Sequence, residues 1–362
     1  MSGRWALPPL SLGDMAPEFA AVSRTNPAFH FSTVAGRHVL LAFMPRDAAA
    51  RDAAIAAVEP LMRRFEGRFL AAFFVAREPE SDAIPPDHAP GQRWFFDPED
   101  RIAPLFHLGP EEGAWLLLDP ASRLVARAPI DQPEAVFGPI LAGLPPLDAY
   151  AGVSLVAPVL IVPRVFEPEF CRRLIDLYEA RGGEPSGVMR DVDGRTVGIM
   201  DGMKKRRDVN LKDDADLRAE IIARIRRAIA PMVRRTFQFD ATRIERYIVS
   251  CYDAEEGGYF HAHRDNQSLA TAHRRFACSI NLNAGEYDGG DLRFPEFGTR
   301  TYRPPTGGAV VFNCNLLHEA TPVTRGRRYA FLPFLYDEEG QRIRERNLAL
   351  MESRAPQPAD AR

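Results

Sequence analysis

The chain has 362 residues, which suits two domains at the usual size of roughly 100 to 200 residues each. Hydrophobic residues make up 46% and charged residues 26%, a globular composition that excludes general disorder. The 46 basic and 49 acidic residues give a net charge of -3, so we expect no nucleic-acid partner and no membrane partner. The N-terminal stretch lacks a signal-peptide core and no apolar run reaches about 18 residues, so we expect a cytoplasmic protein.

Residues 1–145 are expected to form an α/β domain. Continuous apolar runs, typical of strands buried on both faces, lie at 38–43, 68–76 and 114–119. Between the first two runs, residues 46–65 place their apolar side chains on one helical stripe. The order is therefore strand, helix, strand, and a turn at Asp119 leads into 125–130, which predicts a hairpin.

A linker rich in proline and glycine at 146–154 separates this half from a second domain at 155–342. Helical spacing predicts helices at 167–183 and 214–237. Short strand-like runs follow, and they predict a sandwich or open barrel of antiparallel sheets: 243–252, 259–265, 274–283, 291–297, 308–315 and 327–336. Residues 343–362 are expected to be a C-terminal tail, of which 352–362 have no apolar pattern and are expected to be loose.

The four cysteines lie far apart and show no CxxC spacing. This pattern indicates neither a disulfide framework nor a structural zinc site. Buried free thiols are the expected state of all four, Cys171, Cys251, Cys278 and Cys314.

Three residues of the second domain could bind a metal ion. His263 and Asp265 are two apart in a strand-like run, so their side chains should leave the same face and converge. His318 follows another apolar strand, and Arg328 lies ten residues later, beyond a turn. A strand, a turn and a return strand would set Arg328 beside His318, aimed into the same cavity.

The residue types favour iron over zinc. Two histidines and one carboxylate form the facial triad of non-haem Fe(II), whereas zinc more often takes three histidines, or two with Glu. Arginine captures a carboxylate or phosphate through two hydrogen bonds, and a hydrolytic zinc site does not need such a clamp. Arg328 therefore indicates an iron site that works with a chelating acid.

The stretch 155–340 resembles the prolyl 4-hydroxylase-like branch of the 2-oxoglutarate and Fe(II)-dependent dioxygenases. The motifs that carry this resemblance are YDAEEGGYFHAHRD (252–265), GGDLRFP (289–295) and HEATPVTRGRRY (318–329). The resemblance implies a double-stranded β-helix, or jelly roll, that uses Fe(II), 2-oxoglutarate and O2, and it admits ascorbate as a further cofactor. It implies roles for six residues: His263, Asp265 and His318 bind iron, Arg328 binds the distal carboxylate of 2-oxoglutarate, and Tyr252 and Asn281 hydrogen-bond the co-substrate.

The first domain resembles the thioredoxin-like fold in its peroxiredoxin form. The matching stretches are GDMAPEF (13–19), the strand that ends in Phe43-Met-Pro45, FFDPEDRIAPLFHLGP (95–110) and the LLLDPASRLV hairpin (116–125). Peroxiredoxin chemistry needs a low-pKa thiolate seven residues after the proline, with Thr or Ser three residues before it. Ala49 and Asp52 hold those places, so no peroxidase or disulfide chemistry is expected. The domain could serve as a scaffold, as the surface of a homodimer or as a cover for the substrate.

Four assignments have alternatives. His261 shares the expected strand face with His263, and Arg327 could replace Arg328 as the clamp. His273 is expected to be a solvated loop residue. The basic run 204–207 is expected to be a solvated face, with guidance of an anionic substrate as the alternative.

The sequence therefore predicts an α+β protein, a jelly-roll oxygenase domain preceded by a thioredoxin-like α/β domain. We expect it to hydroxylate an unactivated C–H bond of a small-molecule or amino-acid-derived substrate and to release succinate and CO2. A prolyl or other side-chain hydroxylase that acts on a peptide or protein is the first alternative. A non-catalytic protein that senses or docks through the same metal site is the second.

Overall fold

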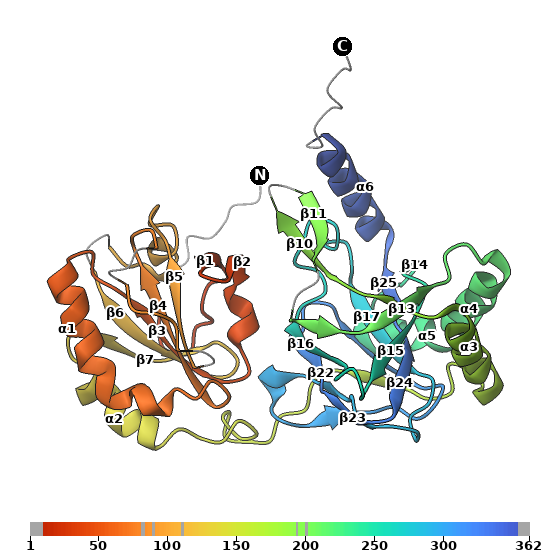
Figure 1. Cartoon of the computed structure of the whole chain (residues 1–362), viewed down its shortest axis with the longest axis horizontal. Helices are drawn as coiled ribbons and strands as arrows, with labels where there is room; N and C mark the ends of the chain where they lie inside the picture. Colours follow the sequence, from red (N-terminus) through yellow and green to blue (C-terminus); the bar gives the residue numbers. More distant parts are fainter. Residues whose placement is uncertain are drawn as a thin grey trace, which may run out of the picture. The chain divides into compact units, whose positions relative to one another are not determined.

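The computed structural model describes residues 10–80, 84–88, 91–109, 112–192, 195–199 and 202–353 (Figure 1). Contacts within the chain divide it into two compact units. Unit 1 comprises Met1–Ala157 and the short segment Pro295–Arg300, and unit 2 comprises Pro158–Phe294 and Thr301–Arg362.

Unit 1 is built on one seven-stranded sheet with the strand order β2-β1-β5-β4-β3-β6-β7. Its strands are β1 (Ala20–Ser23), β2 (Asn26–His30), β3 (His38–Phe43), β4 (Leu70–Ala76), β5 (Gln92–Phe96), β6 (Ala114–Leu118) and β7 (Leu124–Pro129). Its helices are α1 (Ala48–Val58) and α2 (Pro133–Ala142), with 3-10 turns η1 (Phe31–Val34), η2 (Glu59–Arg64), η3 (Ala103–Phe106) and η4 (Pro295–Phe297).

The strand, helix, strand order and the hairpin predicted for this unit are confirmed. Strand β3 pairs parallel with β4 after α1, and β6 and β7 pair antiparallel. Alternate residues of β3 enter two different cores, as strands covered on both faces require. Leu40 packs with Val58 of α1 and Phe137 of α2, while Leu41 packs with Phe106 of η3. The thioredoxin-like assignment stays a prediction.

Unit 2 is rich in antiparallel sheet, which confirms the predicted sheet type and fits a jelly roll. One sheet has the order β12-β16-β22-β19-β20, and a nine-stranded sheet includes the path β14-β25-β17-β24-β15-β13-β9. The strands of the smaller sheet are β12 (Lys204–Lys205), β16 (Tyr259–His263), β19 (Leu292–Arg293), β20 (Thr301–Tyr302) and β22 (His318–Ala320).

The second sheet of unit 2 is the larger one. Its strands are β8 (Leu160–Val162), β9 (Glu184–Pro185), β13 (Arg207–Asn210), β14 (Arg243–Glu245), β15 (Ile248–Asp253), β17 (Phe276–Asn281), β21 (Ala309–Asn313), β24 (Arg327–Phe331) and β25 (Phe334–Tyr336). Two separate pairs complete the unit: β10 (Val188–Val192) with β11 (Arg195–Ile199), and β18 (Asp288–Gly289) with β23 (Val323–Arg325).

Helices α3 (Pro168–Arg181), α4 (Ala215–Ala228) and α5 (Ala230–Phe237) belong to the same core as the larger sheet. Leu174 of α3 and Ile221 of α4 are fully buried there with Val249 and Phe331 of the sheet. The single helix expected at 214–237 is wrong, because the chain forms two helices that meet at Ile229. The cause is Pro231, which has no N–H to continue the hydrogen-bond ladder.

Helix α6 (Glu338–Ser353) occupies the first part of the region that was predicted to be a C-terminal tail. Most of the segment that was expected to be loose, residues 354–362, lies outside the described residues. The four cysteines are free and buried, as predicted. Among the described residues, no helix combines the length and the apolar character needed to cross a lipid bilayer.

Candidate functional site

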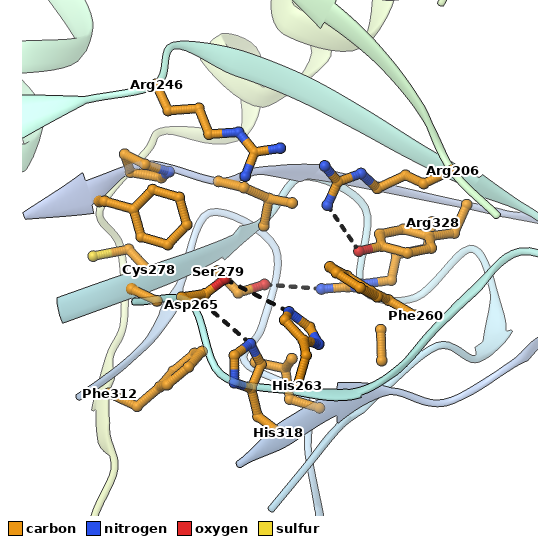
Figure 2. Close-up of a pocket in the computed structure, with 17 residues that line it drawn as sticks. Arg206, Arg246, Phe260, His263, Asp265, Cys278, Ser279, Phe312, His318 and Arg328 are labelled. Carbon is orange, nitrogen blue, oxygen red and sulfur yellow. Dashed lines mark hydrogen bonds and ion pairs between the residues drawn. The ribbon is translucent and has the colours of Figure 1, made fainter. Parts of the chain in front are cut away.

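The structure brings His263, Asp265 and His318 together at the smaller sheet of unit 2. Strands β16 and β22 pair so that His263 lies opposite His318. The potential ligand atoms of the three residues all lie within 4.8 Å of one another. The Nε2 atoms of His263 and His318 are 3.6 Å and 3.3 Å from the two carboxylate oxygens of Asp265 (Figure 2).

The convergence was predicted, but its local geometry was not. Strand β16 ends at His263, so Asp265 lies in the following turn instead of on the same strand face. A hydrogen bond from its backbone N–H to the carbonyl of Cys314, 2.9 Å long, holds this turn beside the segment that leads to His318. The two histidines are therefore placed by strand pairing and the aspartate by a turn.

Both imidazole rings are oriented for metal binding. Nδ1 of His263 lies 2.8 Å from the carbonyl oxygen of His261, and Nδ1 of His318 lies 3.0 Å from that of Leu316. A carbonyl oxygen can only accept, so each Nδ1 donates a hydrogen, and Nε2 is the ring nitrogen left to face the other two residues. Both Nε2 atoms lie beside the carboxylate of Asp265, where one cation could contact all three side chains.

The electrostatic surroundings also suit a cation. Burial and the neighbouring imidazole of His318 lower the pKa of His263 to about 4, so its ring is neutral near pH 7. Burial alone would raise the pKa of Asp265, but the adjacent His318 and His263 hold it well below its usual range. Two histidines and one carboxylate form the donor set of non-haem Fe(II), so the residues fit this ion.

Arg328 points into the same cavity from the larger sheet. The side chain is buried, with 2% of its surface exposed, and its Nη2 donates to Ser279 Oγ at 2.8 Å. Strand β24 pairs with β15 so that Arg328 lies opposite Tyr252, and its guanidinium carbon is 5.0 Å from the centre of that tyrosine ring. The prediction that Arg328 would stand beside His318 on a return strand is wrong, because β22 and β24 belong to different sheets.

The structure distinguishes Arg328 from Arg327 and His263 from His261 by where their side chains lie. Arg327 is exposed, and its Nε donates to Asp253 at 2.7 Å, so it leaves the face of β24 opposite to the cavity. His261 is also exposed and does not line the cavity. Asn281 is buried but does not line the cavity either, and its amide nitrogen donates to the carbonyl of Pro304 at 3.0 Å.

The expectation for His273 is wrong. The residue is 1% exposed, and its Nε2 lies 2.9 Å from a carboxylate oxygen of Glu245, which also accepts from Arg274 at 2.6 Å. Burial opposes ionisation of Glu245, but these two partners lower its pKa to about 2. The partner of His273 lies on strand β14, far away in the sequence, and for this reason local sequence gave no signal of burial.

Two further arginines line the cavity. Arg206 belongs to the run 204–207, for which guidance of an anionic substrate was only the alternative, and Arg246 was not singled out as a site residue. Arg206 is 6% exposed and lies in the run 204–207, so a solvated face is the wrong description of that run. Lys204 is also 6% exposed, whereas Lys205 is exposed. The alternation of side chains in an extended segment, which points every second one inward, could have indicated that Lys204 and Arg206 are buried. Arg246 lies in the two-residue break between β14 and β15, where the sequence predicted an unbroken strand.

The cavity between these residues has a volume of about 460 Å³, including its open mouth. Figure 2 shows Arg206 and Arg246 on the side away from His263 and His318. Apolar side chains from both sheets complete the wall, among them Phe260, Leu292, Phe312 and Phe334. The cavity therefore combines a metal triad, three guanidinium groups and an apolar lining, which is the usual make-up of a small-molecule site.

Similar proteins support this interpretation of the cavity. Residues 247–336 match the family described as the 2OG-Fe(II) oxygenase superfamily. Two PKHD-type hydroxylases from Synechococcus sp. are 34% identical over 93 residues, which cover 24% of this chain and 41% of each relative. The chain thus spans less than half the length of these relatives.

A longer match is the PKHD-type hydroxylase of Cupriavidus metallidurans, 28% identical over 213 residues, which cover 53% of this chain and 86% of the relative. Among solved structures, a Pseudomonas putida prolyl-4-hydroxylase is similar at 17% identity and a TM-score of 0.39, with coverage of 50% of this chain and 93% of that protein. The family match includes the metal triad, and proteins of this superfamily use Fe(II), 2-oxoglutarate and O2. Residues 247–336 of unit 2 therefore match the 2OG-Fe(II) oxygenases over the stretch that contains the metal triad.

Proposed function

We propose that the chain is an Fe(II)- and 2-oxoglutarate-dependent dioxygenase that hydroxylates an unactivated C–H bond of a small-molecule or amino-acid-derived substrate. The observation that carries the proposal is the metal triad His263, Asp265 and His318 in one cavity with the buried Arg328. Within the described residues, no carboxylate lies at ion-pair distance from Arg328, so its guanidinium is available to an anionic co-substrate.

Each residue has a distinct part in the proposed reaction. His263, Asp265 and His318 would hold Fe(II), and three protein ligands leave the remaining coordination positions for small molecules. Arg328 would fix the distal carboxylate of 2-oxoglutarate through two charge-assisted hydrogen bonds, with Ser279 orienting the guanidinium. When bound, iron with 2-oxoglutarate and O2 supplies the oxidising chemistry, in which one oxygen atom enters succinate and the other the substrate. The apolar wall keeps water from the reacting atoms.

The experiment that tests the proposal measures 2-oxoglutarate turnover by the full chain loaded with Fe(II). We expect succinate to form at a basal rate without substrate and faster with a suitable substrate. The His318→Ala variant should form none above the background of free iron, whereas the His261→Ala variant should match the unaltered protein. Binding of 2-oxoglutarate without any succinate formation would contradict the proposal and favour a sensor or docking protein.

A hydroxylase that acts on peptides is the alternative within the same chemistry. Prolyl peptides and free amino acids, supplied separately, distinguish the two through the rate of succinate formation and the mass of the product. A product 16 Da heavier only in the peptide series would assign the chain to the alternative.

We further propose that unit 1 has a thioredoxin-like fold that lacks redox chemistry. The support is the parallel pair β3–β4 joined by α1, the antiparallel hairpin β6–β7 and the lack of cysteine in residues 1–157. Asp52 is exposed on α1, at the place where a peroxiredoxin carries its thiolate. We expect the full chain not to turn over peroxide, and catalytic peroxide consumption with dithiothreitol would contradict this assignment.

A further inference from the structure

The cavity holds more positive charge than the proposed co-substrate requires. Arg206 and Arg246 line it together with Arg328, and all three guanidinium groups reach the same space (Figure 2). In the proposed function, Arg328 serves the distal carboxylate of 2-oxoglutarate. Arg206 and Arg246 lie on the side of the cavity away from the two histidines.

Arg206 already has protein partners. Its Nη2 donates to Asp208 at 2.8 Å and to Ser186 Oγ at 3.3 Å, and its Nη1 donates to the hydroxyl of Tyr252 at 3.3 Å. Arg206 is therefore held in place, and its charge is matched by Asp208.

Arg246 is much less satisfied. Its nearest carboxylate oxygen is that of Asp208 at 3.6 Å, and within the described part of the chain its guanidinium makes no hydrogen bond. Asp208 also accepts from Ser250 Oγ at 2.6 Å and from Arg206. One carboxylate cannot neutralise two guanidinium groups, so a positive charge remains on this side of the cavity.

The other charged groups nearby do not remove this excess. Arg274 is paired with Glu245, and Asp265 belongs to the metal triad. Burial and the charge of Arg206 lower the pKa of Lys204 to about 6, so this amine is neutral near pH 7. Burial and Arg206 also lower the pKa of Arg246, to about 10, which leaves it cationic near pH 7.

The backbone of Arg246 indicates that the break between β14 and β15 does not itself require this residue. Its φ of +67° lies in the left-handed region, which favours glycine or asparagine over a long side chain. Residues held in that region tend to cluster at functional sites. Here the unusual backbone directs a guanidinium into the cavity, over the ring of Phe334 at 5.6 Å.

We infer that Arg246, held beside Arg206, binds a carboxylate of the substrate, so that the substrate of this oxygenase is a carboxylic acid. The inference rests on the proposed function and adds a substrate class to it. A planar carboxylate can take two parallel hydrogen bonds from the guanidinium of Arg246 and neutralise the excess charge. The same group could come from a free acid or from the side chain or C-terminus of a peptide.

The test compares three sets of probes on the full chain: free L-amino acids, the same amino acids as amides, and short peptides with free or amidated ends. Succinate formation and the product mass report turnover, and calorimetry on the Mn(II)-loaded protein without O2 reports binding of each probe. The variants are Arg246→Gln, Arg246→Lys and, as a matched control on the exposed face of α4, Arg226→Gln.

We expect the unaltered protein and Arg226→Gln to bind at least one carboxylate probe and to reject its amide. Arg246→Gln should lose on the order of 10- to 100-fold in affinity for that probe, and Arg246→Lys should lose less. If Arg246→Gln loses affinity only for peptides with a free carboxylate, the inference is also supported, and the carboxylate belongs to a peptide.

Four results would overturn the inference. One is equal turnover of the acids and their amides, and another is an unchanged probe affinity in Arg246→Gln. In both cases, continued succinate formation would leave the proposed function intact. A third is failure of every carboxylate probe to bind the unaltered protein. A loss of 2-oxoglutarate affinity in Arg246→Gln but not in Arg328→Ala would make Arg246 the co-substrate clamp and would also revise the proposed function.

Discussion

Replacement of Arg328 by alanine should weaken the binding of 2-oxoglutarate by roughly 10- to 1,000-fold. Charge-assisted hydrogen bonds contribute about 1.5 to 3 kcal/mol, and a buried carboxylate left unpaired costs more. The side chain is 2% exposed and donates to Ser279, so water cannot replace the lost guanidinium efficiently. Because no carboxylate of the described residues pairs with Arg328, its removal leaves no uncompensated charge, and the fold should survive.

The assay is calorimetric titration of 2-oxoglutarate into protein loaded with Mn(II) in place of iron, without O2. Metal affinity is measured separately and should be nearly unchanged. Arg328→Lys keeps the charge but loses the planar fork, so its affinity should lie between those of the other two proteins. Arg327→Ala is the matched control, since that side chain leaves the opposite face of the strand and pairs with Asp253. A large loss in the Arg327 variant with little change in the Arg328 variant would refute the assignment of the clamp.

The other predictions concern metal binding, pH and the space around the clamp. His318→Ala should lose metal while His261→Ala keeps it, as measured by metal content after dialysis, and equal content would contradict the triad. Glu245→Gln should lower the free energy of unfolding at pH 7 by about 3 kcal/mol, because the folded pKa is about 2. A lowered pKa stabilises above the unfolded value of about 4.5, so chemical denaturation should show the difference shrinking as pH falls from 4.5 towards 2; a constant difference would contradict this. Gly290→Ala should weaken 2-oxoglutarate binding but not metal binding, because a Cβ would lie 3.0 Å from Cδ of the clamp arginine, whereas Gly285→Ala, with open space around it, should do neither.

The metal triad could be predicted from the sequence because its members belong to short motifs with a chemical reason for their spacing. The apolar strands could be predicted for a similar reason, since burial on one or both faces leaves a periodic pattern. The path of the chain between the motifs could not. Arg328 lies across the cavity from His318 instead of beside it, because the segments after His318 join two different sheets. The spacing of residues in the sequence does not show that the chain passes from one sheet to the other.

The sequence did not predict which polar and charged side chains are buried, and the cause is physical. A charged residue is buried only when its partner is in place, and the partner usually lies on another strand. His273 is buried because Glu245 faces it, and Arg206 because Asp208 and Tyr252 do. A local window that contains His273 or Arg206 therefore looks solvated.

Arg246 differs from these residues, because its protein contacts do not explain its position. Arg206 and the His273 pair are explained by their protein partners, so their burial says nothing about a ligand. Arg246 has a disfavoured backbone, lines the cavity and shares Asp208, its nearest carboxylate among the described residues, with Arg206. A fold that only needed the break between β14 and β15 would gain from glycine at this position. The guanidinium is therefore best explained by what enters the cavity, which connects a local backbone feature to the choice of substrate.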